Sequence, residues 1–330
     1  MADLNEQAAD AMARLWRPQG AEQGPWLLCN DDGRLTTTLR RDGHQVLGWN
    51  RWSKGSERGV PSPPTENYAG ALLRIPKEKQ ALEFALHLIA GRLKTGQPLW
   101  LYGGNKEGIK SAKKALSPLY EAIESVGAKN HCRVWSGVRS EHQPKGDLAD
   151  WWQRSEINLD GTPCAWSSLP GVFARGRLDP ATALLIEALP TQNEKVSILD
   201  FGCGPGAISR ALQNRYPRAD LHLLDADAIA LVCARVNVPS VHYYESDGWA
   251  HAPSGPFDLI VSNPPIHAGK VEDHRMLDTL ITESPKYLMP GGQLILVGQG
   301  RLRLEARMKQ VFRKPVMLNR NSRFQVWSSR

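Results

Sequence analysis

The chain has 330 residues, of which 41% are hydrophobic and 23% charged, and its formal net charge is +7. This length predicts two domains with substantial cores. The basic balance favours an acidic partner such as nucleic acid, although many basic enzymes bind none.

Five scattered cysteines without a C-x-x-C pair argue against a zinc site and against a disulfide framework. No apolar run reaches the ~20 residues that span a bilayer, and the polar N-terminus is not a signal peptide. We therefore expect a cytoplasmic protein with no metal and no membrane partner.

The N-terminal half has a faint α/β pattern. Short apolar runs predict strands at residues 26–29, 71–75 and 98–102, and 3.6-residue periodicity predicts helices at 78–93 and 109–126. A segment rich in Pro, Ser, Trp and charge, at residues 48–67, is interpreted as a surface excursion. The Gly-rich stretch at 103–108 resembles a nucleotide loop, but an ordinary strand-to-helix turn explains it equally well.

The C-terminal half repeats the pattern more clearly, after a polar, Trp-rich connection at about residues 140–168. Apolar runs at 196–201, 221–224, 241–244, 257–262 and 293–297 are each separated by room for a helix. Strands that alternate with helices predict a parallel, doubly wound sheet, so the fold class is α/β.

A glycine turn follows the first of these strands and precedes a helix expected to begin near Ala207. Gly202 permits a tight turn, and Gly204 and Gly206 let the backbone approach a ligand without a Cβ clash. The same spacing also satisfies the G-x-G-x-x-(G/A) dinucleotide fingerprint, so the loop alone leaves the cofactor open.

Three acidic residues accompany this loop. Asp225 ends the second strand about 20 residues later, where an acid accepts hydrogen bonds from ribose hydroxyls; the alternative is a helix N-cap. Asp200 precedes the glycines, as in methyltransferases, where an acid at this position helps to hold the methionine end through its loop. Asp247 follows the third strand, where methyltransferases place an acid or amide against the exocyclic amine of adenine. These features favour S-adenosyl-L-methionine as the cofactor.

An Asn-Pro-Pro sequence, Asn263, Pro264 and Pro265, ends the fourth strand directly. The nitrogen of an aryl amine is a poor nucleophile because its lone pair is delocalised into the ring. Two acceptors, the Asn263 side-chain oxygen and the Pro264 carbonyl, can grip the two amine hydrogens and turn the lone pair toward a methyl donor, so that positioning dominates catalysis. The alternative is a plain strand-ending turn. His267 either contacts substrate or, as we prefer, serves as a structural hydrogen-bonding group.

Several motifs resemble one family in order: LPGVFARGRLD at residues 169–179, LDFGCG at 199–204 and SNPPIHAG at 262–269. They are similar to bacterial ribosomal RNA guanine-N2 methyltransferases of the 16S type, the ribosomal small subunit methyltransferase C family. Looser matches lie at residues 73–77 and 102–108.

The resemblance implies two tandem Rossmann-like domains: a degenerate one at 1–140 without a cofactor site, which supports folding and RNA binding, a linker at 141–168, and a methyltransferase domain at 169–330. It places Phe173 near the cofactor, with core packing as the alternative. It also implies methylation of guanine N2, with ribosomal RNA or the small ribosomal subunit as the partner. We expect a monomer.

Basic residues form two groups. Lysines gather where the 103–108 loop becomes a helix, and arginines and lysines dominate residues 301–323. Together they suit a phosphate backbone, although each alone is also typical of a solvated surface. Two alternatives to the lead hypothesis stay open: a methyltransferase of another amine (other RNA, DNA or protein glutamine), and a non-catalytic RNA-binding or assembly factor with a methyltransferase fold.

One position departs from the family. Ile266 stands where an aromatic residue usually follows Asn-Pro-Pro and stacks on the flipped base, a contact worth roughly 1–3 kcal/mol. Ile266→Phe is therefore expected to raise kcat/KM on ribosomal RNA. A clear loss in a protein that still folds and binds cofactor would show instead that the pocket is built around isoleucine, because a new ring would overpack it.

Overall fold

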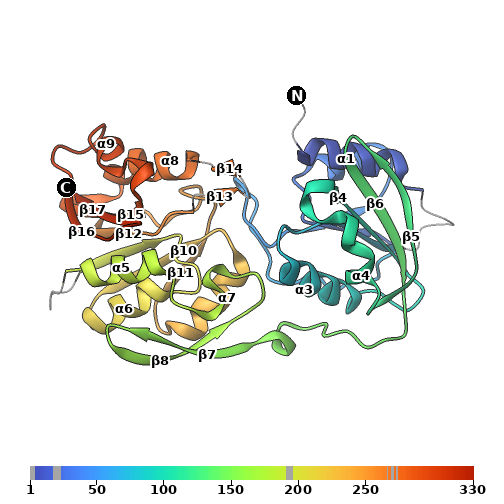
Figure 1. Ribbon diagram of the computed structural model, residues 1–330, viewed down its shortest axis with the longest axis horizontal. Coiled ribbons are helices and arrows are strands. Elements are labelled where there is room, and N and C mark those ends of the chain that lie inside the picture. The colour runs from blue at the N-terminus through green and yellow to red at the C-terminus, as the bar shows by residue number, and fades with distance from the viewer. Residues whose placement is uncertain (1–3, 18–23, 191–195, 266, 269–270, 273) are drawn as a thin grey trace. The chain divides into compact units, whose positions relative to one another are not determined.

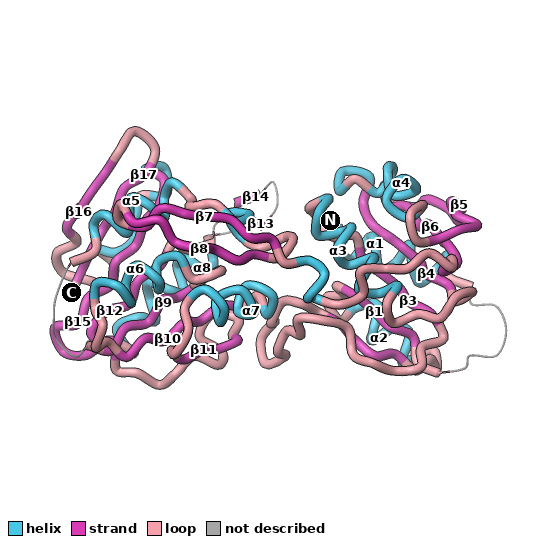
Figure 2. The backbone as a smooth tube through the Cα atoms, turned by 90° about the horizontal axis from the view of Figure 1, so that it is seen from below, coloured by secondary structure: helices cyan, strands magenta, loops and turns pink. Residues whose placement is uncertain are grey.

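The structure, a computed structural model, describes residues 4–17, 24–190, 196–265, 267–268, 271–272 and 274–330. The chain divides into two compact units: unit 1 contains Met1–Arg51 and Val60–Trp152, and unit 2 contains Trp52–Gly59 and Gln153–Arg330. Each unit is an α/β structure with its own large sheet (Figures 1 and 2). No helix in the described ranges is long and apolar enough to cross a membrane.

Unit 1 is built on a six-stranded sheet in the order β2-β1-β3-β4-β6-β5. The first four strands are parallel neighbours, and β6 and β5 continue the sheet antiparallel. Its elements are α1 (Leu4–Leu15), β1 (Trp26–Cys29), α2 (Arg34–Arg41), β2 (Val46–Trp49), β3 (Gly70–Arg74), α3 (Lys79–Ala90), β4 (Pro98–Gly104), η1 (Asn105–Glu107), η2 (Ile109–Ser111), α4 (Ala112–Leu116), β5 (Tyr120–Lys129), β6 (Cys132–Arg139) and η3 (Leu148–Trp151).

The helix predicted at residues 109–126 is wrong in its second half. Helix α4 ends at Leu116, and Tyr120–Lys129 forms strand β5, which pairs antiparallel with β6. Pro118 has no N–H with which to continue the helical hydrogen bonds, so the chain is free to turn there. The partner strand β6 then satisfies the backbone of β5, a long-range contact that local periodicity does not reveal.

Unit 2 contains a seven-stranded sheet in the order β11-β10-β9-β12-β15-β17-β16. Strands β11 to β15 in this order are parallel, and β17 and β16 are antiparallel. Its elements are β7 (Gln153–Leu159), β8 (Thr162–Ser168), η4 (Phe173–Gly176), α5 (Pro180–Ala188), β9 (Ser197–Phe201), α6 (Ala207–Arg215), β10 (Asp220–Asp225), α7 (Ala228–Asn237), β11 (His242–Glu245), β12 (Phe257–Ser262), β13 (His267–Ala268), β14 (Val271–Glu272), α8 (Arg275–Glu283), η5 (Ser284–Lys286), β15 (Leu288–Gln299), η6 (Gly300–Leu302), α9 (Leu304–Met308), β16 (Val316–Arg320) and β17 (Phe324–Ser329).

Both faces of the unit 2 sheet are covered by helices. Along β15, Leu294 and Leu296 join a core with α8 and α9, whereas Ile295 and Val297 join a core with α5, α6 and α7 (Figure 1). This alternation is the period-2 pattern of a strand buried on both faces. Residues 153–168, within the expected linker, form the β7–β8 hairpin, which packs against α7 (Figure 2).

The two sheets have the same topology except for one edge strand. Removing β11 from unit 2 leaves an order that matches unit 1 strand for strand, including the parallel region and the two final antiparallel strands. Unit 1 is therefore a second copy of the fold, and its described residues form no counterpart of β11, the strand that precedes Asp247.

Unit 1 also lacks a glycine loop after its corresponding strand. The connection at residues 30–33 is closed by Asp31, whose carboxylate accepts from the backbone N–H groups of Gly33, Leu35 and Thr36. Helix N-terminal amides are the groups that bind an anionic ligand in nucleotide-binding folds. Because a side chain of the protein engages them here, unit 1 is degenerate at this position.

Gly206, the N-cap of α6, is required by helix packing. It has φ +96°, and a Cβ at this position would lie 2.6 Å from Cγ2 of Val238. A side chain at this position would therefore collide with the end of α7. The glycine spacing in the sequence instead predicts close approach of the backbone to a ligand at Gly206.

We expect Gly206→Ala to lower the free energy of unfolding by about 2–4 kcal/mol, because positive-φ strain and overpacking add. Gly161→Ala is the matched control: Gly161 has φ +79° with nothing within 4 Å of its Cβ position. Strain alone there should cost about 1 kcal/mol. Urea denaturation measures both, and equal losses would contradict the packing explanation.

Candidate active site

The β9–α6 loop crosses the end of β10. The N–H groups of Gly202 and Cys203 donate to the carbonyl of Leu224, and the N–H of Gly204 donates to Asp225 Oδ2 at 2.7 Å. Gly202 and Gly204 both have positive φ, +72° and +55°. A Cβ on Gly204 would meet no atom closer than 3.9 Å, so this side of the loop is open to a ligand.

Asp225 holds this loop and does not cap the following helix. Its Oδ1 accepts from the N–H of Asp227 at 2.8 Å, and Asp227 is the N-cap of α7, accepting from the N–H of Ile229 at 3.1 Å. The alternative role of Asp225 as N-cap is therefore wrong. Its carboxylate lies at the carboxyl end of a parallel strand, where ligands of doubly wound sheets bind.

Asp200 is buried beside the same loop, with an exposed fraction of 1%. Its Oδ2 accepts from Ser209 Oγ at 2.5 Å, and its Oδ1 has no hydrogen-bond partner among the described residues. Burial raises the pKa of Asp200 to about 7; the Ser209 hydrogen bond opposes this rise and the charge of Asp225 adds to it. An unsatisfied buried acceptor of this kind fits a ligand that brings a donor or a positive charge to the loop.

Phe173 is exposed and lies next to the glycine loop. The side chain is 55% exposed, and its Cβ would lie 3.9 Å from a Cβ on Gly204. Core packing, the alternative explanation for this residue, is therefore wrong. Phe173 begins η4, in which Ala174 and Arg175 have positive φ values of +61° and +49°. Such strained backbone is typical of segments that shape a ligand site.

The loop after β11 presents Asp247. Ser246 braces this turn, because its hydroxyl donates to the carbonyl of Gly248 and accepts from the N–H of His251, both at 2.8 Å. Asp247 Oδ2 accepts from the N–H of Gly55 at 3.0 Å. Because β10 and β11 are parallel neighbours, Asp247 follows the strand end next to that of Asp225.

The Asn263 amide has a defined orientation. Its Nδ2 donates to Asp179 Oδ1 at 3.1 Å and to Thr182 Oγ1 at 2.9 Å. A carboxylate only accepts hydrogen bonds, so the NH₂ end must face Asp179 and the oxygen must face away. Pro264 is buried and Pro265 is exposed, and a Cβ on Gly202 would lie 3.7 Å from Cδ of Pro265. The structure thus brings the Asn-Pro-Pro sequence beside the glycine loop.

Three positioning residues were not singled out from the sequence. Asp179 and Thr182 orient Asn263, and Asp179 is also the N-cap of α5. Asn237, at the end of α7, bonds the backbone of Ser167 and donates to the carbonyl of Pro205 at 3.0 Å, and so steadies the glycine loop. Asp179 closes the 169–179 motif, whereas no local pattern marks Asn237.

Two predicted substrate residues have no described side chain. Ile266 lies outside the described residues. His267 begins the short strand β13, which pairs with β14, and only its backbone is described.

A hollow of about 420 Å³ lies just beyond the end of β15, lined by three arginines, one aspartate and three uncharged residues. Arg301, Arg303 and Arg307 line it together with Asp278. Arg307 is paired with Asp278, and Arg303 has φ +50° between η6 and α9. Since β15 neighbours β12 in parallel, this hollow and Asn263 lie at the same edge of the sheet.

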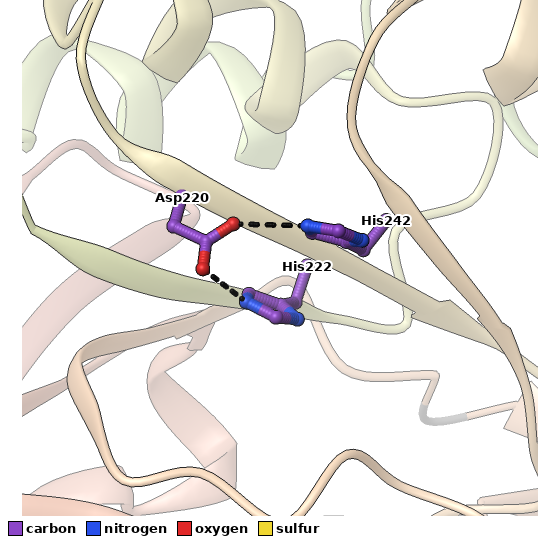
Figure 3. A group of neighbouring side chains, drawn as sticks. All are labelled: Asp220, His222 and His242. Atoms are coloured by element: carbon purple, nitrogen blue, oxygen red, sulfur yellow. Dashed lines mark ion pairs between the residues drawn. The ribbon is translucent and has the colours of Figure 1, made fainter.

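Asp220, His222 and His242 form a separate cluster (Figure 3). The Asp220 carboxylate lies 3.2 Å from His222 Nε2 and 3.1 Å from His242 Nε2. Burial lowers the pKa of His222, and Asp220 opposes this shift. The cluster occupies the beginnings of β10 and β11, whereas Asp225 and Asp247 follow their ends. A carboxylate that accepts from two imidazoles explains these contacts without an ion.

Comparisons with known proteins agree with this geometry. The "Methyltransferase small domain" model matches residues 164–328, and the "Methyltransferase small domain N-terminal" model matches residues 38–155. The chain is 32% identical to the ribosomal RNA small subunit methyltransferase C of Hahella chejuensis, over 94% of this chain and 95% of the relative. It is 37% identical to the ribosomal RNA small subunit methyltransferase C of Ectopseudomonas mendocina, over 76% of this chain and 75% of the relative.

Among solved structures, the chain is similar to the T. thermophilus 16S rRNA N2 G1207 methyltransferase in complex with AdoMet and guanosine. The TM-score is 0.83 at 22% identity, and the match covers 98% of this chain and 91% of the other. The fold and the strand-end site define an S-adenosylmethionine-dependent methyltransferase with a degenerate N-terminal copy of its fold. The chain belongs to the ribosomal RNA small subunit methyltransferase C family.

The raised pKa of Asp200 predicts a pH-dependent stability. The folded-state pKa of about 7 exceeds the unfolded value of about 3.9, so the stabilisation present below about pH 4 is lost as the pH rises toward 7. Asp200→Asn should remove this loss, which is on the order of a few kcal/mol. Urea unfolding between pH 5 and pH 8 tests it, with the exposed Glu187→Gln as control. An unchanged pH slope in Asp200→Asn would contradict the prediction.

Proposed function

We propose that this protein transfers the methyl group of S-adenosyl-L-methionine to the exocyclic N2 amine of a guanine in 16S ribosomal RNA. Its partner is ribosomal RNA or the small ribosomal subunit, and it acts in the cytoplasm as a monomer. The observation that carries the proposal is the Asn263 amide, held with its oxygen turned away from Asp179 and Thr182 beside an open glycine loop.

The cofactor would lie along the carboxyl ends of β9, β10 and β11. Asp225 would accept from its ribose hydroxyls, Asp247 from the adenine amine, and Asp200 would act on the methionine end through the loop. Phe173 would cover the cofactor beside Gly204. When bound, the cofactor supplies an electrophilic methyl group. The order of these groups follows the order of the strands in the sheet.

Asn263 and Pro264 would perform the positioning step. The Asn263 Oδ1 and the Pro264 carbonyl would each accept one hydrogen of the amine, which turns its lone pair toward the methyl group. These oxygens also stabilise the positive charge that develops on nitrogen in the transition state. No strong general base is needed, because the methylated amine is acidic and loses its proton afterwards.

Two kinds of observation favour guanine in ribosomal RNA over other amine substrates: the similar proteins, and the parts of this chain outside the methyl-transfer site. The family relatives carry a ribosomal RNA name, and the structural neighbour is described with guanosine. The second copy of the fold at the N-terminus and the arginine-lined hollow beyond β15 suit a large polyanionic substrate. The alternative, a non-catalytic RNA-binding or assembly factor with a methyltransferase fold, would bind the cofactor but would not transfer its methyl group to any RNA.

Mass spectrometry of ribosomal RNA nucleosides from cells with and without the gene tests the proposal. Loss of N2-methylguanosine at one position of 16S RNA, restored by the purified enzyme with S-adenosylmethionine, is the expected result. An unchanged nucleoside profile would overturn it.

Asn263→Ala should fold and bind S-adenosylhomocysteine normally, but its single-turnover rate should fall by more than about tenfold, or roughly 1.4 kcal/mol. Thr182→Val keeps the shape of Thr182 and removes one of the two acceptors that hold Asn263. It should lower the rate by a smaller factor, because Asp179 still holds the amide. Normal turnover in Asn263→Ala would refute the assigned role.

A further inference from the structure

A short segment from the N-terminal half of the chain belongs to the methyltransferase unit. Residues Trp52–Gly59 leave unit 1 after Arg51 and return to it at Val60. The segment forms a small hairpin in which Lys54 and Glu57 exchange both backbone hydrogen bonds, at 2.9 and 3.0 Å. It lies within the surface excursion predicted at residues 48–67.

The backbone of this segment is fixed to the end of β10. The N–H of Ser53 donates to the carbonyl of Ala226 at 2.8 Å, and Trp52 forms an antiparallel bridge with Asp227. Ala226 directly follows Asp225, the residue assigned to the ribose. The segment therefore runs along the strand end where the proposed function places adenosine.

Ser53 is the buried anchor of the segment, with an exposed fraction of 6%. Its hydroxyl donates to Glu245 Oε1 at 2.8 Å and accepts from the N–H of Gly59 at 3.1 Å. One hydroxyl thus ties both ends of the hairpin to the last residue of β11. Without it, the buried N–H of Gly59 and the half-buried carboxylate of Glu245 each lose a hydrogen-bond partner.

The tip of the hairpin contacts the adenine-binding turn itself. The N–H of Gly55 donates to Asp247 Oδ2 at 3.0 Å, and the carbonyl of Ser56 lies 3.2 Å from His251 Nε2. A carboxylate with one oxygen held by a backbone amide presents its other oxygen in a defined direction. Asp247 is therefore aimed by a residue nearly 200 positions earlier in the chain.

We propose that Trp52–Gly59 is the outer wall of the adenosine site, and that Ser53 and Gly55 are positioning residues that aim Asp247 at the exocyclic amine of adenine. This inference rests on the proposed function. Under this inference, cofactor recognition depends on a segment from the N-terminal half of the sequence. The segment lies within residues 38–155, which match the N-terminal family model, and outside residues 164–328, which match the methyltransferase model. The segment thereby gives residues from the N-terminal half of the sequence, which fold into the methyltransferase unit, a part in selecting an adenine-containing cofactor.

Calorimetry with two ligands tests the inference: S-adenosylhomocysteine, and S-inosylhomocysteine, in which a carbonyl oxygen replaces the amine. An aimed carboxylate accepts from the amine and repels the carbonyl, so the intact protein should prefer the adenosyl ligand by at least about tenfold. Ser53→Ala should weaken the binding of S-adenosylhomocysteine by about fivefold or more. It should change the affinity for S-inosylhomocysteine by less than about twofold, so that the preference for the adenosyl ligand shrinks.

Ser254→Ala is the matched control, because Ser254 is an exposed serine of the same unit that lies outside the proposed wall. It should bind both ligands like the unaltered protein, and Ser53→Thr, which keeps the hydroxyl, should restore the preference. In an Asp247→Ala background, Ser53→Ala should have no further effect on the preference. If Ser53→Ala does not fold, Glu245→Ala removes the same anchor from the other side and should narrow the preference in the same direction.

Equal weakening of both ligands by Ser53→Ala, or no weakening of either, would overturn the inference while leaving the proposed function intact. Failure of the unaltered protein to bind S-adenosylhomocysteine would instead overturn the proposed function, and with it this inference.

Discussion

The hydrogen bond from the N–H of Gly204 to Asp225 is the contact on which the site depends. It joins the loop after β9 to the end of β10, and so sets the position of the glycine loop relative to the neighbouring strand. The loop is also held by the amide of Asn237, which donates to the carbonyl of Pro205, and the close approach of Val238 leaves room only for glycine at position 206. These contacts arise because parallel strands deliver their carboxyl ends to one edge of the sheet.

The two units show how the same topology gains or loses a ligand site. Unit 1 repeats the strand order of unit 2 without a counterpart of β11 in the part of the chain that the structure describes, and Asp31 engages the helix amides that follow its first strand. Its fold is retained because its own apolar core, which includes Leu28 and Leu72, stays buried. Loss of a binding loop therefore does not require loss of the sheet, since the core and the strand ends are different parts of the fold.

In the proposed mechanism, chemistry at the amine depends on orienting groups more than on charge. Asn263 offers a neutral acceptor, which avoids the cost of burying another carboxylate near Asp200 and Asp225. Its direction comes from Asp179 and Thr182, which lie about 80 residues earlier at the start of α5. The N-cap of one helix thus sets the geometry of a motif at the end of a strand.

The sequence by itself determined the parts that rest on local rules. Short apolar runs predicted the strands of unit 2. The glycine spacing and Asn-Pro-Pro predict a cofactor site and an amine site, and the structure places these two motifs side by side. Tertiary structure alone decided the rest: residues 120–129 became strand β5 because β6 satisfies their backbone, and Asp227 rather than Asp225 caps α7. The orientation of Asn263 and the contact of Gly55 with Asp247 join residues far apart in the chain. No local pattern encodes such contacts, because they form only when the sheet brings its strand ends together.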